Sequence, residues 1–473
     1  MFRTFLQLVL FLVTLSSQAQ NLVIKNVNVI PMDKDTVLNR QDVFIEGYRI
    51  DRIATSGSET YRGYEEVEAT GKFLIPGLSD MHMHFLADDR IADEYRKHEL
   101  LVPLTYGVLS GRVPIGNSGL LRDKVLIDQG DLLGPYLQIG SPQLAGVNFS
   151  PVFNGSLVKT EQEAYQAVKR YKNEGYAFIK ITFGVNEAVY ESIIRAGRDF
   201  DIPIAGHVPV AVGIRKALQA NQDIEHLDQY MDGILSDDPP TKTGLSAFGL
   251  FRSKSWQTVD HIDTAKIQEL IDLTVASGVW NTPTNHFFVS SFARKVPDEE
   301  LVNNPAYTLV SEEVRNELLS MRQRYWSRAV NQEKREKYVD LRSLFIREIF
   351  RSNQHILAGS DSPEWLNLYG GALHKELFNF VEIVGLTPYE ALYTATMAPA
   401  QYLNQLDRGV IKAGGRADLV LLDQNPLENV RNLGGIAGVI LKGRWMDKAA
   451  LNALYEQAKE KLAKAPLRPE YRE

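Results

Sequence analysis

The sequence predicts an α/β protein in which a (β/α)8, TIM-like barrel is joined to a small β-sandwich domain built from both termini. Two observations predict the barrel. Strand-like and helical segments alternate between about residues 74 and 400, and histidines, a lysine and an aspartate recur on these strand-like segments. A third observation predicts the smaller domain: short β-type runs lie near both ends of the chain, and neither set is long enough to enclose a core alone.

Composition limits the classes of function. The chain has 473 residues, enough for a barrel and a smaller domain. Its net charge is −7 and no basic cluster stands out, so we expect no nucleic-acid partner. It contains no cysteine, which excludes disulfides and thiol-linked lipid. The expected partner is a small-molecule substrate, and the sequence leaves a homo-oligomer open.

Residues 1–19 have the pattern of a signal peptide. Arg3 supplies the positive start, residues 5–15 form an apolar core, and Ser17-Gln18-Ala19 is a small-x-small cleavage site. This apolar core is too short to span a bilayer comfortably, and no other apolar run of about 18 residues follows, so we expect no stable membrane anchor. The predicted location is a bacterial periplasm or the medium.

The two terminal regions form the predicted β-sandwich domain. Runs at 22–30 and 43–53 alternate in the β manner, and those at 417–423 and 438–443 are also strand-like. We expect this composite domain to comprise residues 20–73 and 405–447. The barrel, residues 74–404, would be inserted between its halves, and residues 448–473 would form a C-terminal helical tail.

The barrel segments can be placed in chain order. Strands are predicted near 74–82, 104–109, 136–141, 176–182, 202–207, 223–226, 278–282 and 355–361, and helices are clearest at 161–174, 185–199, 263–277 and 388–404. The interval 287–352 is longer than a βα unit needs, and its charged part, 311–351, has an amphipathic helical pattern. We expect an insertion there, over the mouth of the barrel, that could shape substrate access.

His82 and His84 begin the candidate site. Side chains alternate along an extended strand, so both imidazoles point to one side and can bind one metal ion. Pro76-Gly77 breaks any helix before them, and the apolar residues around this pair suit a buried strand. Two ordinary histidines near a loop would give the same pattern, so the prediction depends on further ligands downstream.

Further candidate ligands lie on later strand-like segments. Lys180 lies among apolar residues; a buried neutral lysine can add carbon dioxide, giving a carbamate that bridges two cations, although a lysine reaching out to solvent is an alternative. His207 and His226 end two successive segments, where core or supporting histidines are the alternative. Asp361 follows an apolar run, where it could instead cap a helix.

Taken together, these residues predict one metal centre at the carboxyl ends of the strands, suited to zinc or a similar divalent ion: His82, His84, Lys180, His207, His226 and Asp361. With this set the sequence resembles the amidohydrolase superfamily, and within it enzymes similar to imidazolonepropionase and Xaa-Pro dipeptidases. The resemblance extends over nearly all the mature chain and includes residues 73–84, 391–400 and 409–423.

The resemblance implies a role for each matching residue. His82 and His84 would bind the more buried of two divalent metal ions, His207 and His226 the more exposed one, and carbamylated Lys180 would bridge both. Asp361 would complete the buried site and act as the general base. The implied reaction is hydrolysis of an amide-like bond by hydroxide that two cations generate near neutral pH.

Three residues are weaker candidates for substrate contact. Arg112 could clamp a carboxylate, with a surface ion pair as the alternative. Tyr230 could donate a hydrogen bond at the mouth, with buried packing as the alternative. His374 matches a histidine common after the last barrel strand in the family, which implies a role beside the metal ligands.

The predicted function is a periplasmic binuclear amidohydrolase that cleaves a dipeptide of the Xaa-Pro type or an N-acyl amino acid. A lactonase or esterase is an alternative, because the same hydroxide attacks either carbonyl. A non-catalytic metal- or solute-binding barrel is the third hypothesis, against which Asp361 argues, since a binder needs no general base. Residues 141–150 lack the Gly-Gly-His-like segment of many relatives, which weakens transfer of a dipeptide or imidazolone substrate.

Overall fold

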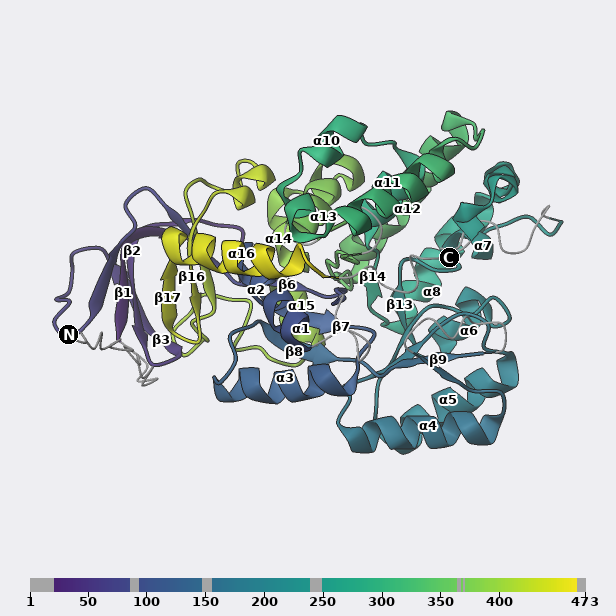
Figure 1. The fold of residues 1–473 in the computed structure, drawn as a ribbon, viewed down its shortest axis with the longest axis horizontal. Helices are drawn as coiled ribbons and strands as arrows, with labels where there is room; N and C mark the ends of the chain where they lie inside the picture. The colour runs from purple at the N-terminus through teal and green to yellow at the C-terminus, as the bar shows by residue number, and fades with distance from the viewer. Residues whose placement is uncertain are drawn as a thin grey trace, which may run out of the picture.

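The structure is a computed structural model that describes residues 21–85, 93–146, 155–238, 249–363, 367–368 and 371–465 (Figure 1). The predicted signal peptide, residues 1–19, lies outside the described residues, as do residues 466–473 of the predicted helical tail. No helix in the described part of the chain is both long and apolar enough to cross a membrane.

Strands from both ends of the chain form one eight-stranded sheet. Its order is β17 (Arg444–Asp447), β16 (Ile436–Leu441), β15 (Leu419–Leu422), β5 (Phe73–Pro76), β1 (Leu22–Val29), β2 (Leu38–Glu46) and β3 (Arg49–Thr55), and β4 (Glu65–Glu68) pairs with β1. Strands near both ends of the chain thus belong to one β structure. The hydrogen bonds connect a single sheet rather than two separate ones, and its two halves contribute to a common buried cluster.

The predicted strand at 74–82 is two strands that serve different sheets. Residues 73–76 pair with β1 and β15, whereas β6 (Leu78–Asp80) pairs in parallel with β7 (Val108–Val113). Gly77 separates them, and a Cβ atom there would lie 2.6 Å from the Leu109 side chain. The change of sheet therefore needs a residue without a side chain.

The central part of the chain contains only parallel pairings in its two sheets. One has the order β6, β7, β8 (Tyr136–Ile139). The other has the order β10 (Gly155–Leu157), β9 (Gln143–Ala145), β11 (Ile179–Ile181), β12 (Ile204–Gly206), β13 (Asp223–Glu225) and β14 (Asn281–Thr282). Seven of the eight predicted barrel strands overlap strands of the structure, most of which are shorter than expected. The eighth, at 355–361, contains an isolated bridge at Ile356 instead of a regular strand.

Isolated parallel bridges join these two sheets into a ring. Gly140 pairs with Phe178, Asn281 with Ile356, and Met83 with Ser362. The pairings therefore follow the order β6, β7, β8, β11, β12, β13, β14 and residues 356–362, and then return to the segment after β6. This cyclic order brings the carboxyl end of β6 beside Asp361.

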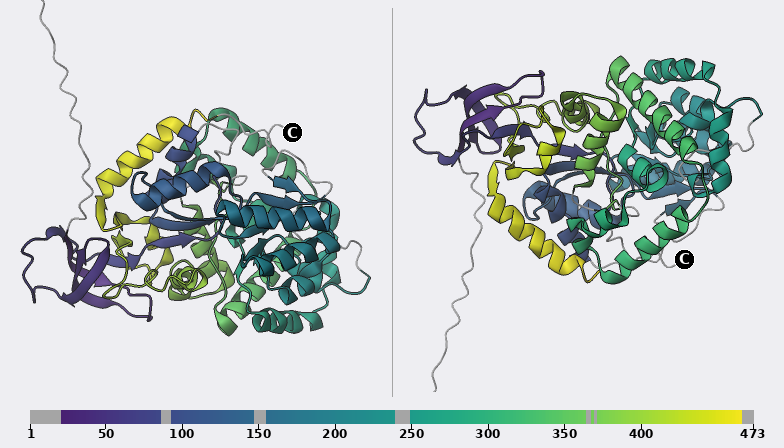
Figure 2. Two further views of the ribbon diagram at one scale, coloured as in Figure 1. Left: turned by 90° about the horizontal axis from the view of Figure 1, so that it is seen from below. Right: turned by 90° about the horizontal axis from the view of Figure 1, so that it is seen from above.

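The helices that follow these strands lie around the ring (Figures 1 and 2): α3 (Ser118–Gln129), α4 (Glu161–Glu174), α5 (Glu187–Asp199), α6 (Gly213–Gln219), α7 (Tyr230–Gly233), α8 (Ala265–Ser277), α13 (Ala372–Asn379), α14 (Pro388–Thr394) and α15 (Met397–Tyr402). Helix α4 begins at a reciprocal capping box formed by Thr160 and Glu163. The predicted strand at 104–109 was placed too early, because α2 (Leu101–Thr105) precedes β7.

The long interval 287–352 contains several helices. They are α9 (Asn285–Phe288), η3 (Val289–Ala293), α10 (Asp298–Val302), η4 (Pro305–Leu309), α11 (Glu312–Trp326) and α12 (Gln332–Asn353). Helix α12 packs against α8, η2 (Ser253–His261), η3 and η5 (Phe380–Val384), so it is part of the layer of helices around the ring. The predicted insertion therefore includes a helix of this layer, a correction to the expectation that all of it covers the mouth.

Further helices are α1 (Asp93–Glu99), η1 (Gly249–Phe251), η6 (Val430–Gly434) and α16 (Lys448–Leu462). Helix α16, yellow in Figure 2, runs along one side of the molecule and packs against α1, α2 and β16. It begins at Asp447, whose carboxylate accepts a hydrogen bond from the Ala450 N–H. The described part of the predicted tail is thus mainly a helix.

Candidate metal centre

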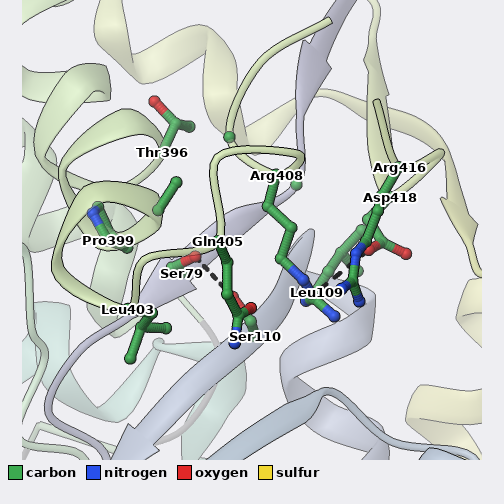
Figure 3. Close-up of a pocket in the computed structure, with 13 residues that line it drawn as sticks. Ser79, Leu109, Ser110, Thr396, Pro399, Leu403, Gln405, Arg408, Arg416 and Asp418 are labelled. Atoms are coloured by element: carbon green, nitrogen blue, oxygen red, sulfur yellow. Dashed lines mark hydrogen bonds and ion pairs between the residues drawn. The ribbon is translucent and has the colours of Figure 1, made fainter. Parts of the chain in front are cut away.

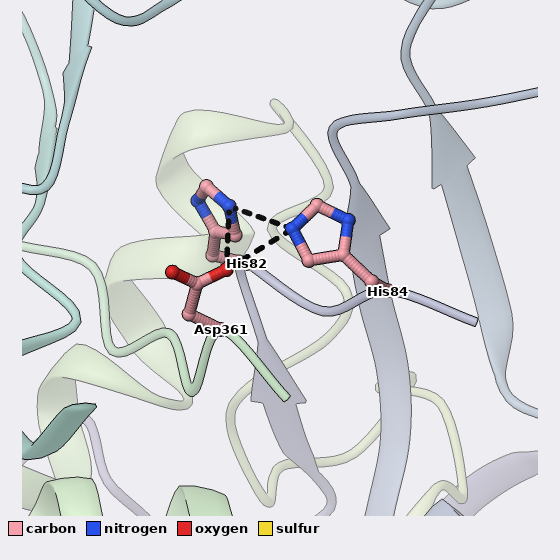
Figure 4. A group of neighbouring side chains, drawn as sticks. All are labelled: His82, His84 and Asp361. Atoms are coloured by element: carbon pink, nitrogen blue, oxygen red, sulfur yellow. Dashed lines mark hydrogen bonds and ion pairs between the residues drawn. The ribbon is translucent and has the colours of Figure 1, made fainter. Parts of the chain in front are cut away.

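Three buried side chains meet after β6 and at residue 361 (Figure 4). The Nε2 atoms of His82 and His84 are 3.2 Å apart, and Asp361 Oδ1 lies 3.3 Å from the first and 3.0 Å from the second. All three ligand atoms fall within 4.8 Å of one another. Two imidazoles and a carboxylate at such distances can hold a divalent metal ion.

Backbone contacts hold the two segments of this group together. The Asp361 N–H donates to the His82 carbonyl at 2.7 Å, and the His84 N–H donates to the Ser362 carbonyl at 2.7 Å. At Gly359, a Cβ atom would lie 2.7 Å from His82 Cβ, so glycine permits this close approach. Asp361 itself has φ 55°, a strained conformation for a residue with a side chain that the surrounding hydrogen bonds maintain.

Lys180 lies at the centre of β11 and is fully buried. Its Nζ has no hydrogen-bond partner among the residues that the structure describes. Burial lowers the pKa of this amine, although the charges of Glu225 and Asp361 act in the opposite direction. A lysine with a lowered pKa and no hydrogen-bond partner is suited to become a carbamate, whose oxygens would bind metal ions.

His207 and His226 extend the group. Their rings stack with centroids 4.8 Å apart, and the His226 ring lies 4.6 Å from that of His82. His207 Nδ1 donates to Asp228 Oδ2 at 2.6 Å, and His226 Nδ1 is 2.8 Å from Thr284 Oγ1. The structure therefore brings all six predicted ligand residues into one cluster, while their roles as ligands stay predictions.

Burial sets the protonation of the cluster. It lowers the pKa of His82 and His226 well below the usual value, and the pKa of His207 is also lowered. These imidazoles are therefore neutral, the form in which histidine binds metal ions. Burial also raises the pKa of the Asp361 carboxyl, although the positive charge of Lys180 opposes this. The Asp361 carboxyl group is therefore stabilised either by a bound proton or by a nearby cation.

Sequence reasoning missed Glu225, which orients His82. This buried carboxylate accepts a hydrogen bond from His82 Nδ1 at 2.5 Å through Oε2 and forms an ion pair with Arg112 through Oε1. The bond at Nδ1 leaves His82 Nε2 as the acceptor atom on the Asp361 side. An acidic residue at the end of an apolar strand, directly before His226, was the available signal in the sequence.

Asp80 and Asp228 were also missed. Asp80 Oδ1 accepts hydrogen bonds from the backbone N–H groups of His82 and Ser360, at 3.2 and 2.9 Å, and so ties the two ligand-bearing segments together. Asp228 orients His207 in the way that Glu225 orients His82. Both residues lie two positions from a predicted ligand, but many polar residues share that spacing, so the sequence alone does not single them out.

The structure places all three predicted substrate-contact residues in the interior of the protein, and their contacts with a substrate stay predictions. Arg112 is buried and donates to the Met81 carbonyl, to Thr282 Oγ1 and to the Tyr402 hydroxyl as well as pairing with Glu225. These bonds use four of the five N–H donors of the guanidinium, and through them Arg112 positions Glu225.

Tyr230 is also fully buried, in the apolar core beside Phe345. Its hydroxyl donates to Asn281 Oδ1 at 2.9 Å and accepts from Thr274 Oγ1 at 3.1 Å, so it acts as both donor and acceptor inside the protein. These contacts are those of core packing, the alternative that the sequence left open for Tyr230.

His374 lies on α13, where its contacts are with Tyr106 and Phe378. Its Nε2 is 2.9 Å from the Tyr106 carbonyl oxygen, and its ring faces the rings of Tyr106 and Phe378. Burial lowers its pKa to about 4, so the imidazole is neutral and donates to that carbonyl. These contacts join α13 to the end of α2, and the role of His374 beside the metal ligands stays a prediction.

Comparisons with known proteins identify solved structures with a similar fold. The chain is similar in fold to a bottromycin amidohydrolase (18% identity, TM-score 0.71, 93% of this chain and 90% of that one). It is similar to a protein of Bifidobacterium longum described as a prolidase (21%, TM-score 0.65, 93% and 99%). A Xaa-Pro dipeptidase with bound methionine is also similar (20%, TM-score 0.62, 90% and 100%). No curated protein sequence matches the chain.

These likenesses, all below 25% identity, show the fold. The model of the family described as the amidohydrolase family matches residues 73–446, which include β5, the whole ring and β15 to β17 up to residue 446. That match covers well over half of the chain and contains every residue of the cluster described above. The chain therefore belongs to the amidohydrolase family.

Proposed function

We propose that this protein is a metal-dependent amidohydrolase that cleaves an amide bond in a small substrate, such as an Xaa-Pro dipeptide or an N-acyl amino acid. The observation that carries the proposal is the convergence of His82, His84 and Asp361 beside a buried Lys180 without a hydrogen-bond partner. We further propose that the ring of parallel pairings is the (β/α)8 barrel, a reading that the similar solved structures support.

The residues present fit divalent metal ions. His82 Nε2, His84 Nε2 and Asp361 Oδ1 lie 3.0–3.3 Å from one another, and a cation between them would be held by all three atoms. His82, His84 and Asp361 would hold one ion, His207 and His226 a second, and carbamylated Lys180 would bridge both. Ions bound there would lower the pKa of a water molecule and polarise the scissile carbonyl.

The protein's own residues would carry the proton. Asp361 lies at the centre of the cluster, and burial raises its pKa toward the range in which a carboxylate exchanges protons near neutral pH. It can accept a proton from water and pass it to the leaving amine. Glu225, held by Arg112, fixes the ring of His82, so that the geometry around Asp361 persists through the reaction.

Aromatic side chains pack against His207 and His226. The Phe183 ring lies 4.0 Å from that of His207, and the Phe288 ring lies 5.5 Å from that of His226. An apolar surround of this kind lowers the local dielectric constant, which strengthens electrostatic interactions with a developing negative charge. The arrangement therefore suits attack on a carbonyl carbon.

The descriptions of two similar proteins favour a dipeptide as the substrate class. Two of the similar structures are described as a prolidase and a Xaa-Pro dipeptidase, which supports a dipeptide for this chain. A hydrolysis screen over Xaa-Pro dipeptides, other dipeptides, N-acyl amino acids and lactones tests the proposal, with an Asp361→Asn variant as the matched control. We expect an amide to be cleaved by the wild type alone. Turnover of lactones only would assign an esterase, and no turnover by metal-replete protein would favour a binding protein.

A further inference from the structure

A large cationic cavity lies where the eight-stranded sheet meets the ring. Its volume is about 970 Å³, and its lining includes residues of β1, β7, β8, α3 and the β16–β17 hairpin. Five cationic side chains line it, against the two carboxylates Glu65 and Asp128: Lys124, Arg408, Arg416, Lys442 and Arg444. A protein with a net charge of −7 thus concentrates positive charge at one internal surface.

Arg408 is the unusual member of this lining. Its side chain is only 12% exposed, yet its guanidinium makes no hydrogen bond to any residue that the structure describes, and Nε is shielded from solvent. Asp418 Oδ2 approaches it at 3.8 Å, too far for a hydrogen bond, and this oxygen also lacks a partner. Buried polar groups normally have partners, so an unsatisfied guanidinium facing a cavity requires an explanation.

The neighbouring cationic residues leave the Arg408 guanidinium without a hydrogen-bond partner within the described ranges of the chain. Three cationic groups surround the Tyr136 ring: Arg408 at 3.5 Å, Lys442 at 4.8 Å and Arg416 at 5.9 Å. Arg416 is already paired with Asp407 at 2.9 Å, and Lys442 donates to the Ile127 carbonyl. Burial lowers the pKa of Arg408, in agreement with a cation that lacks sufficient compensation.

Figure 3 shows the Arg408 guanidinium beside Arg416 and Asp418, in a smaller pocket that also includes Ser79, Ser110 and Gln405. Both pockets include Arg408, Arg416, Gln405 and Ser110, so they form neighbouring parts of one region. Neither has a lining residue in common with the metal cluster.

We propose that this region is a binding site for a small oxyanion, a phosphate or a carboxylate group, with Arg408 as its main ligand. The planar guanidinium presents paired N–H donors that match two oxygens of such a group. The Ser79 and Ser110 hydroxyls are paired at 2.6 Å, which leaves one O–H of the pair to donate, and the Gln405 amide supplies further N–H donors in the same lining. Because the lining includes residues of both the sheet and the ring, a bound oxyanion would also strengthen the junction between them.

Calorimetric titration of the full-length, metal-replete protein with inorganic phosphate, and separately with acetate, tests the site at constant ionic strength set with sodium chloride. We expect one binding event for at least one anion, together with a rise in Tm. Phosphate alone would assign a phosphate site, and acetate alone a carboxylate site. Arg408→Gln should weaken binding roughly tenfold or more, because it removes charge-assisted hydrogen bonds.

Arg431→Gln is the matched control, since this exposed arginine pairs with Glu382 outside the cavity. It should bind the anion as the wild type does. Phosphate also binds metal ions, so metal content is measured for each variant, and a loss confined to Arg408→Gln cannot arise at the metal centre. If Arg408→Gln does not fold, Arg408→Lys, which keeps the charge without the paired donors, replaces it and should weaken binding less. Equal binding by wild type and the folded Arg408 variant, or no binding of either anion, would overturn the proposal.

Discussion

At the scale of single residues, Asp361 and Lys180 occupy the same buried cluster but would serve different purposes. Asp361→Asn keeps the size and one oxygen of the side chain but removes the charge and the proton acceptor. We expect metal to be largely retained while turnover falls by roughly 10²–10⁴-fold or more. Lys180→Ala would remove the bridge, so metal content and rate should fall together. Metal analysis and initial rates on the same preparations distinguish the two variants.

Near wild-type turnover by Asp361→Asn, on the best substrate from the screen, would show that Asp361 is not the base. Full metal content in Lys180→Ala would show that Lys180 is not the bridge. Each result addresses one role, so either role could fail while the other survives.

Glu225→Gln tests the positioning of His82. The substitution preserves shape but weakens the acceptor for His82 Nδ1, and it leaves Arg112 without its carboxylate. Loss of such supporting bonds typically lowers metal affinity or activity by roughly 10–100-fold. We expect weaker metal binding in a competition assay with a chromogenic chelator.

Glu382→Gln, which alters an exposed ion pair with Arg431, is the control and should leave metal affinity unchanged. Because removing one partner of a buried pair also costs stability, Tm is measured for both variants. A lowered Tm with unchanged metal affinity would mean that Glu225 only stabilises the fold.

The sequence predicted the six cluster residues better than the residues that orient them. His82 and His84 could be found because strand alternation and strand ends determine where a ligand points. Glu225 and Thr284 could not, because each contacts a histidine from another strand, and the contact depends on the final packing. The pairing of Arg112 with Glu225 could not be predicted for the same reason: a forked donor beside the site fits a substrate carboxylate and a buried glutamate equally well.

At the scale of elements, β2 is tied to its neighbours by one carboxylate, Asp42. It accepts hydrogen bonds from the N–H groups of Asn26 and Gly57, at 2.8 and 2.9 Å, and from the Tyr61 hydroxyl at 2.7 Å. Burial raises the pKa of Asp42, but these hydrogen bonds outweigh burial and the net pKa is lowered. Asp42→Asn should lower the free energy of unfolding by about 1–3 kcal/mol at neutral pH.

A carboxyl whose pKa is lowered by folding stabilises the protein above its unfolded pKa, and that stability is lost as the pH falls through the folded value. The difference in Tm between wild type and Asp42→Asn should therefore be largest at neutral pH and shrink below about pH 4. The exposed Asp131, whose carboxylate has no partner among the described residues, provides the control variant Asp131→Asn. A difference that does not change with pH would mean that the charge of Asp42 is unimportant.

Element types were predicted more reliably than element boundaries. The predicted strand at 74–82 includes residues of two strands, and only the pairing partners reveal that Gly77 divides it between two sheets. The strand predicted from residue 104 overlaps the end of α2, and Gly107, with φ 70°, ends the turn before β7. Helix α12 could be predicted as helical, but its place in the layer around the ring depends on contacts that amphipathicity does not specify.

At the scale of the whole molecule, we propose that the protein is exported. The pattern of residues 1–19 predicts cleavage after Ala19, which would leave Gln20 as the first residue. Expression in a bacterial host followed by amino-terminal sequencing of the periplasmic fraction checks this. The control is the same chain with Leu8 and Leu10 replaced by Lys, which interrupts the apolar core and should keep the protein in the cytoplasm. Exported protein that still begins at Met1 would contradict the prediction.

The central claim is that hydrolysis depends on metal ions held by the cluster of His82, His84, Lys180, His207, His226 and Asp361. One titration tests it most directly: chelated protein is supplied with Zn²⁺, and bound metal and amide hydrolysis are measured at each step. We predict that activity is absent without metal, rises with bound metal and saturates near about two ions per chain. Saturation at one ion or fewer would contradict the bridged pair, and full activity in the chelated protein would contradict metal dependence itself.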